Sequence, residues 1–179
     1  MIAIVPIGEF SAEFLAEVGS IIAASLDAQM ILTARIPLSS EAYNARRDQY
    51  HSTQILQTLA NVKRQNWERM LGVVDVDLYI PELNFVFGEA DMKRGVAIFS
   101  LARLRTPGST EASKALFIKR AATEGIHELG HTYGLGHCDN AHCVMWFSNT
   151  LAETDRKGLA FCAKHASQLA TARSSRQDS

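Results

Sequence analysis

The sequence predicts an α/β domain built on a mixed, mostly parallel five-stranded twisted sheet with an antiparallel edge strand, a long helix and a small C-terminal helical subdomain. Three observations carry this prediction. Short β-branched runs alternate with segments of helical spacing, one long helical segment follows them, and no linker-like stretch divides the chain. A chain of 179 residues with 47% hydrophobic composition is long and apolar enough to form one compact domain around a single hydrophobic core. We expect a single domain over 1–179, with an N-terminal subdomain over 1–137 and a C-terminal subdomain over 138–179.

The first half of the chain reads as strand, helix, strand, helix. Residues 2–7 form an apolar strand-like run, and residues 11–26 carry apolar side chains at helical spacing. A second strand is predicted over 30–38, followed by a polar surface connection over 39–50 and a second amphipathic helix over 51–65. Strands joined through helices imply parallel pairing.

The second half supplies three more strands and the long helix. The strands are predicted over 73–80, 85–87 and 96–101, and the helix over 111–134 after a loop at 106–110. The short segment from Asn84 to Phe87, between Pro81 and Gly88, is the best candidate for the antiparallel edge strand. The tail after Thr171 is expected to be frayed.

Composition and charge exclude two classes of partner. A formal net charge of −1 gives no broad basic field for nucleic acid or an anionic membrane. No window of about eighteen apolar residues is present, so no membrane span is expected. The apolar N-terminus lacks a positive leader and contains Pro6 and Gly8, so it reads as a strand and not as a signal peptide. A cytoplasmic location follows as the expectation.

The stretch from His127 to His137 has the spacing of a catalytic zinc site. His127 and His131 are four apart on the long helix and can bind one ion together, while Glu128 stands beside that ion as a base. Gly134 can adopt a left-handed conformation, end the helix and return His137 as third ligand. Three His ligands leave one zinc position open for water, as in catalytic sites.

Together with the residues that follow it, this motif resembles the archaemetzincin family of metzincin zinc metallopeptidases. The family pattern H-E-x-x-H-x-x-G-x-x-H-C-x4-C-x-M, then C-x-x-C, is matched through Cys138, Cys143 and Met145 to Cys162 and His165. The last spacer is one residue shorter here, and His165 replaces the final cysteine. The resemblance implies a metzincin-like fold, with the long helix as the active-site helix.

Further roles follow from the same resemblance. Met145 matches the methionine of the turn beneath the zinc, a supporting role that it shares with Gly134. An edge strand above the zinc binds an extended peptide, a role assigned to Phe85, Val86, Phe87 and Gly88. Alternatively, the side chains of Phe85 and Phe87 only fill the core, which would not prevent the backbone of this segment from binding a peptide.

The three cysteines suggest a second, structural zinc site. Cys162 and His165 are three apart at helical spacing, and Cys138 and Cys143 approach from the loop after His137. This gives a closed Cys3His tetrahedron. His142 is a rival fourth ligand, ranked behind His165 because it would have to converge on one ion with its neighbour Cys143.

The predicted function is hydrolysis of peptide bonds with two zinc ions per chain, one catalytic and one structural. Glu128 is the predicted base, the partner is a peptide or protein substrate, and a monomer is expected. Two alternatives use the same residues: a zinc-binding module that recognises peptides without turnover, and a zinc hydrolase of a non-peptide amide.

Overall fold

A five-stranded sheet forms the centre of the molecule in the computed structural model, which describes residues 1–177. In spatial order its strands are β2 (Met30–Leu32), β1 (Ile2–Ile7), β5 (Arg69–Val74), β8 (Val96–Ser100) and β7 (Gly88–Asp91). The first four are parallel, and β7 alone runs antiparallel, at one edge against β8. The structure confirms the predicted α/β class and the mostly parallel sheet with an antiparallel edge strand.

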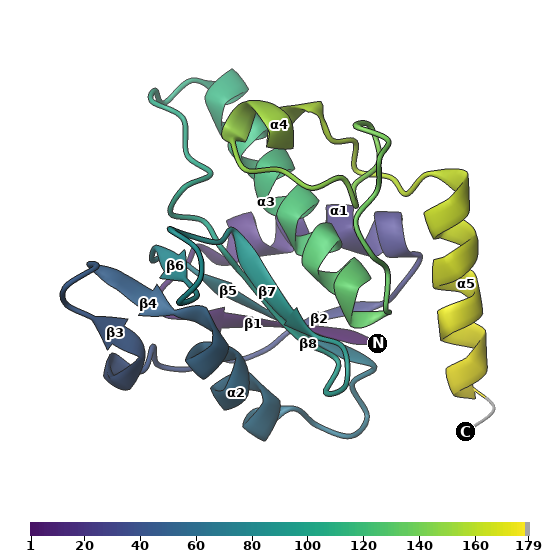
Figure 1. Ribbon diagram of the computed structural model, residues 1–179, viewed down its shortest axis with the longest axis horizontal. Helices are drawn as coiled ribbons and strands as arrows, with labels where there is room; N and C mark the ends of the chain where they lie inside the picture. The colour runs from purple at the N-terminus through teal and green to yellow at the C-terminus, as the bar shows by residue number, and fades with distance from the viewer. Residues whose placement is uncertain (178–179) are drawn as a thin grey trace.

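Helices cover both faces of this sheet (Figure 1). The helices in the described part of the chain are α1 (Ala12–Leu26), α2 (Ser52–Val62), α3 (Glu111–Thr132), α4 (Leu151–Arg156) and α5 (Ala163–Gln177). Helices α1 and α3 pack together on one face and α2 lies on the other. Among residues 1–177, no helix is both long enough and apolar enough to cross a membrane.

The continuous apolar run of β1 is explained by burial on both faces. Ile2 and Ile4 point into the core beneath α1 and α3, while Ala3, Val5 and Ile7 point into the core beneath α2. Successive side chains of a strand alternate between faces, so a strand covered twice has no polar position. Strand β5 is apolar in the same way, except for the buried Arg69 at its start.

A second, smaller sheet adds to one prediction and corrects another. It consists of β3 (Tyr43–Asn44), β4 (Gln49–His51) and β6 (Leu78–Tyr79). The segment over 39–50 lies mostly at the surface, as predicted, but it also holds η1 (Ser40–Ala42), β3 and most of β4, which were not predicted. The predicted strand over 73–80 was wrong: β5 ends at Val74, and Leu78 pairs with Tyr50 in the second sheet.

The edge strand lies three residues later than predicted. Val86 donates its backbone N–H to Leu78 and forms only an isolated bridge there, so residues 85–87 belong beside the second sheet. The pairing along β8 begins at Gly88.

Three further elements also differ from the prediction. Strand β2 ends at Leu32 instead of residue 38, and α4 was not predicted. Helix α5 continues to Gln177, so the expected fraying after Thr171 was wrong up to that residue. Residues 178–179 lie outside the described part. The division into subdomains at residue 137 stays a prediction.

Candidate metal centres and cleft

Helix α3 carries the first half of the candidate metal site and ends where the motif requires it. Thr110 caps its N-terminus by accepting the backbone N–H of Ser113. At the other end Gly134 has a φ of 83°, a left-handed conformation that favours glycine. The N–H groups of Gly134 and Leu135 bond back to His131 and Gly130, which reverses the chain. This reversal brings His137 back toward α3.

Three imidazole rings converge at the end of α3. One ring nitrogen from each of His127, His131 and His137 lies within 4.8 Å of the others. The Nε2 atoms of His127 and His131 are 3.1 Å apart, near the roughly 3.3 Å expected for two nitrogens on one tetrahedral zinc ion. The residues present therefore fit a zinc ion bound by three imidazoles.

Backbone carbonyls orient two of these rings. The Nδ1 atoms of His127 and His131 lie 2.8 Å from the carbonyl oxygens of Val144 and Leu135. A carbonyl can only accept, so each Nδ1 carries the proton and each Nε2 is left with a lone pair for a metal. Burial lowers the pKa of both rings, most strongly that of His127, which favours the neutral form that binds metals.

Glu128 lies next to these rings in the same cavity. Its side chain is 6% exposed, and it is not one of the group of converging donors. Burial raises the pKa of its carboxyl group well above the ordinary value, and the nearby Glu124 raises it further. A buried carboxylate with a raised pKa is a stronger base than an exposed one.

The cavity that contains these groups has a volume of about 420 Å³. The edge strand and the residues before it form one wall, α3 forms the floor, and the loop after Met145 forms the other wall. All four residues predicted to bind substrate line it. The lining residues are Leu83, Phe85, Val86, Phe87, Gly88, Glu89, Ala90, Glu124, His127, Glu128, His131, His137, Phe147, Ser148, Asn149 and Lys157.

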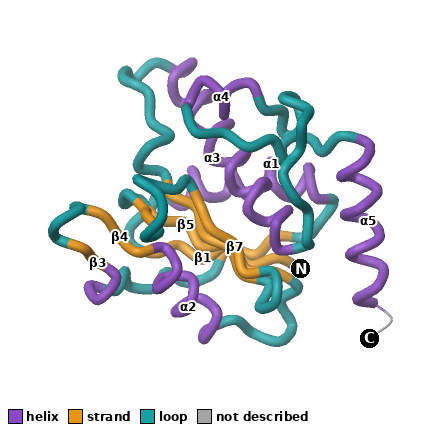
Figure 2. The backbone as a smooth tube through the Cα atoms, viewed as in Figure 1, coloured by secondary structure: helices purple, strands orange, loops and turns teal. Residues whose placement is uncertain are grey.

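The chain between α3 and α4 is one long loop (Figure 2), and Met145 anchors it against the helix. Met145 is fully buried, and a Cβ placed on Gly130 would overlap its sulfur. The carbonyl of Met145 accepts the N–H of Cys138 at 2.9 Å. The loop therefore packs under the turn of α3 that separates His127 from His131.

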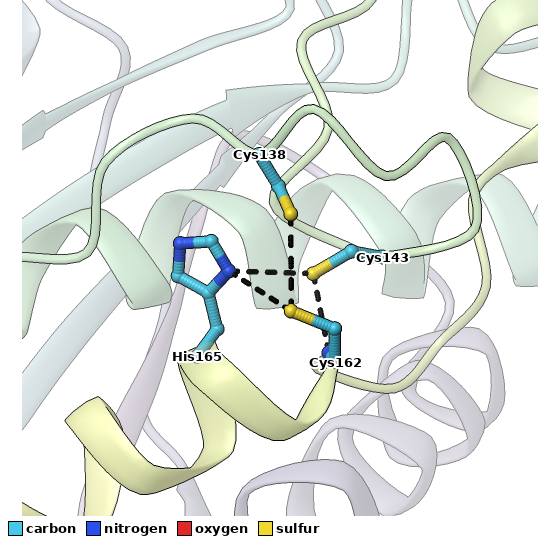
Figure 3. A group of neighbouring side chains, drawn as sticks. All are labelled: Cys138, Cys143, Cys162 and His165. Carbon is cyan, nitrogen blue, oxygen red and sulfur yellow. Dashed lines mark hydrogen bonds between the residues drawn. The ribbon is translucent and has the colours of Figure 1, made fainter.

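Figure 3 shows the second cluster, in which Cys138, Cys143, Cys162 and His165 point toward a common centre. The sulfurs of Cys138 and Cys162 are 3.8 Å apart, and Nδ1 of His165 lies 3.3 Å from Cys162 and 3.7 Å from Cys143. Ligands of a tetrahedral zinc ion with Zn–S bonds of about 2.3 Å stand about 3.8 Å apart. The donor set and its spacing fit one structural zinc ion.

The fourth member of this cluster comes from α5. His165 is buried on α5 and joins the cysteines, whereas His142 is exposed and is not part of the group. The backbone N–H of His165 is the largest cause that lowers the pKa of the Cys162 thiol, to about 6. The geometry therefore places the predicted residue, and not its rival, beside the thiols.

Sequence reasoning missed a buried ion pair in the cleft. Nζ of Lys157 lies 3.2 Å from Oε1 of Glu124, and the side chains are 1% and 2% exposed. Glu124 precedes Glu128 by four residues on α3, so helical spacing could have placed it on the same face. Nothing in the local sequence marks Lys157, because its burial depends on how the loop after α4 packs.

Comparison with known proteins places this geometry in a family. Residues 5–171 match the model of peptidase family M54. The chain is 44% identical to an archaemetzincin of Methanopyrus kandleri over 130 residues, which cover 73% of this chain and 71% of that protein. It is 38% identical to an archaemetzincin of Pyrococcus furiosus over 169 residues, 90% and 88% of the two chains.

Solved structures agree with the sequence relatives. A crystal structure of the archaemetzincin from Methanopyrus kandleri superimposes with a TM-score of 0.85 at 33% identity, covering 97% of this chain and 94% of that one. A zinc-dependent peptidase from Methanocorpusculum labreanum gives a TM-score of 0.84 at 30% identity, covering 94% and 100%. The chain therefore belongs to peptidase family M54, together with the archaemetzincins, and is a zinc metallopeptidase.

Proposed function

We propose that this protein hydrolyses peptide bonds at the end of α3, with zinc held by His127, His131 and His137 and with Glu128 as general base. The observation that carries the proposal is the convergence of three imidazole nitrogens beside a buried carboxylate in one cavity. When bound there, a zinc ion lowers the pKa of a coordinated water toward about 7 and polarises the scissile carbonyl.

Glu128 supplies the proton transfers of this mechanism. Its carboxylate accepts a proton from the attacking water and then donates that proton to the leaving amine. The same group thus acts first as a base and then as an acid. The raised pKa suits both steps, because the protonated form is stable long enough to be the donor. Glu128 is not a ligand in this assignment.

The edge strand supplies the backbone contacts for an extended peptide. Strand β7 pairs with β8 on one side only, so the peptide groups of Gly88–Asp91 on its other side are available to a substrate strand. Gly88 opens this strand directly beside Glu128, which brings the bound peptide within reach of the base. Phe85, Val86 and Phe87 line the cavity ahead of the strand and contact substrate side chains.

A second zinc ion at the four-residue cluster completes the proposal. Held by Cys138, Cys143, Cys162 and His165, it would join the loop under α3 to α5 and hold Met145 in place. Two zinc ions per chain, a monomeric state and a cytoplasmic location remain predictions from the sequence.

The test is cleavage of an unbiased peptide library by the zinc-loaded protein. We expect cleavage that stops when a chelator removes the metal and returns when zinc is added. Glu128→Gln should lower kcat by at least about a thousandfold while leaving the zinc content of the parent, because the amide cannot accept the proton. Loss of zinc from this variant would contradict the assignment of Glu128 as base, and binding of peptides by the zinc-loaded parent without cleavage would favour a recognition module.

A further inference from the structure

We infer that the buried pair of Glu124 and Lys157 forms the floor of the substrate subsite next to the scissile bond and selects an asparagine or glutamine side chain there. The inference rests on the proposed peptidase function and adds to it a substrate class.

The pair stands at the right place for a neighbouring subsite. Glu124 and Lys157 line the same cavity as His127 and Glu128. Because Glu124 lies one helical turn before Glu128, their Cβ atoms are separated by about 5–6 Å. A side chain adjacent to the bond attacked beside Glu128 therefore reaches this pair.

The pair is held rigidly from both sides. Lys157 follows α4, and its N–H bonds to carbonyls of the last turn of that helix. Thr154 of α4 donates to Oε1 of Glu124 at 3.2 Å, and the hydroxyl of Ser148, which also lines the cavity, is 3.2 Å from that of Thr154. Glu124, Lys157 and Ser148 thus form one polar surface of the cavity, connected through the hydroxyl of Thr154, which does not itself line the cavity.

The hydrogen bonds of this floor leave capacity for a ligand. The ammonium of Lys157 has three donors, and Glu124 is its only hydrogen-bond acceptor among the described residues. Within the described part of the chain, the side chain of Glu124 accepts two hydrogen bonds, both at Oε1. The lone pairs of Oε2 are therefore available to a ligand. The cavity wall therefore offers a donor and an acceptor side by side.

A carboxamide is the side chain that satisfies both groups. Its oxygen accepts from Lys157 and its NH2 donates to Glu124, and it adds no charge to a pair that is already neutral. An apolar side chain would exclude water and leave the remaining donors of Lys157 and Oε2 of Glu124 unsatisfied. A carboxylate would pair with Lys157 but face Glu124, and an ammonium would do the reverse, so each brings one repulsive contact and an unbalanced buried charge.

The experiment compares peptides that differ only at the two residues flanking the cleaved bond. At each flank, Gln is compared with Met and Asn with Leu, so that each carboxamide is compared with an apolar side chain of similar length. Further peptides carry Glu or Lys at the same position. We expect Gln or Asn at one flank to raise kcat/KM about tenfold over Met or Leu, as measured by mass spectrometry. Fluorescence anisotropy on zinc-loaded Glu128→Gln protein measures the same preference as binding, without turnover.

A double variant tests whether this pair is the cause. In Glu124→Met with Lys157→Met the floor loses both its carboxylate and its ammonium, and the preference for carboxamides over apolar side chains should disappear. Replacing both members of a buried pair avoids leaving one charge unpaired. The matched control is Glu111→Met with Lys114→Met, the same changes in an exposed ion pair on α3, and it should keep the tenfold preference.

Each result decides between the two proposals. Cleavage with a preference for apolar or charged side chains, or with none at either flank, overturns the inference and leaves the peptidase function standing. Tighter binding of carboxamide peptides without cleavage of any peptide by the zinc-loaded parent supports the inference and overturns the function. A double variant that folds and keeps the preference overturns the inference; if it does not fold, the parent's preferences in cleavage and binding decide.

Discussion

Gly88 and Glu128 are in direct contact across the cleft. A Cβ built on Gly88 would stand 2.5 Å from Cγ of Glu128 and 2.5 Å from the carbonyl oxygen of Ile98. The first residue of the edge strand thus sets how close that strand approaches the proposed base. A larger residue at this position would have to displace both the Glu128 side chain and the backbone of β8.

Gly88→Ala should therefore lower kcat by about a hundredfold, because the methyl group displaces the Glu128 carboxylate by about 1 Å. The zinc content should remain that of the parent, since no histidine is touched. Steady-state kinetics and elemental analysis measure the two effects. Gly136→Ala, where a new Cβ meets no atom within 4 Å, is the control and should keep most of the activity. Full activity in Gly88→Ala would show that Glu128 has room to adjust.

His165→Ala should reduce the zinc content from two ions to one and lower the melting temperature by roughly 5–10 °C, because the α5 ligand of the structural site is lost. His165→Cys should retain both ions, since it supplies a thiolate at the same place. His142→Ala, on the exposed side of the same loop, should leave the zinc count and the melting temperature of the parent unchanged. Two bound zinc ions in His165→Ala would exclude His165 as the fourth ligand.

Met145→Ala should destabilise the protein by about 2–5 kcal/mol, the usual cost of truncating a fully buried Met. Zinc should also bind more weakly, because the adjacent Val144 carbonyl holds His127. Met145→Leu conserves the volume and should cost less than about 1.5 kcal/mol. Denaturant unfolding and zinc titration measure both effects. Unchanged zinc affinity in Met145→Ala would remove Met145 from the support of the site.

The ion pair between Arg120 and Asp155 predicts a pH dependence of stability. Arg120 donates to both oxygens of Asp155 at 2.6 Å and holds the pKa of that carboxyl below its ordinary value. A group whose pKa is lowered by folding stabilises the protein above its unfolded pKa, and this contribution is lost as the pH falls through the folded pKa. Asp155→Asn should therefore cost about 1 kcal/mol at pH 7, a figure reduced for the partial exposure of Asp155, and this cost should shrink as the pH falls below the ordinary pKa of the carboxyl group.

Urea unfolding of the parent and of Asp155→Asn between pH 7 and pH 3 gives this difference directly. Asp75→Asn, in the exposed pair with Arg105, serves as the control and should change the unfolding free energy by less than about 0.5 kcal/mol. A constant difference between parent and Asp155→Asn across the pH range would show that the pair does not titrate with folding.

The sequence alone determined the parts of this protein that depend on local spacing. Helix geometry fixes the arrangement of His127, Glu128 and His131, because they lie within five positions of one helix. The helix ends just before Gly134, whose backbone is left-handed. The apolar run over 2–7 likewise predicts the strand β1 without reference to its neighbours. These features need no knowledge of what packs against them.

Only the tertiary structure decided which distant groups meet. Residues 85–87 look like a strand, but the bridge from Val86 to Leu78 places them beside the second sheet, and the free edge passes to Gly88–Asp91. His165 and not His142 reaches the thiols because α5 packs beside the loop after α3. Lys157 is buried because the end of α4 packs against α3, where Glu124 lies 33 residues earlier. Such contacts depend on the balance of burial over the whole core, which no local pattern records.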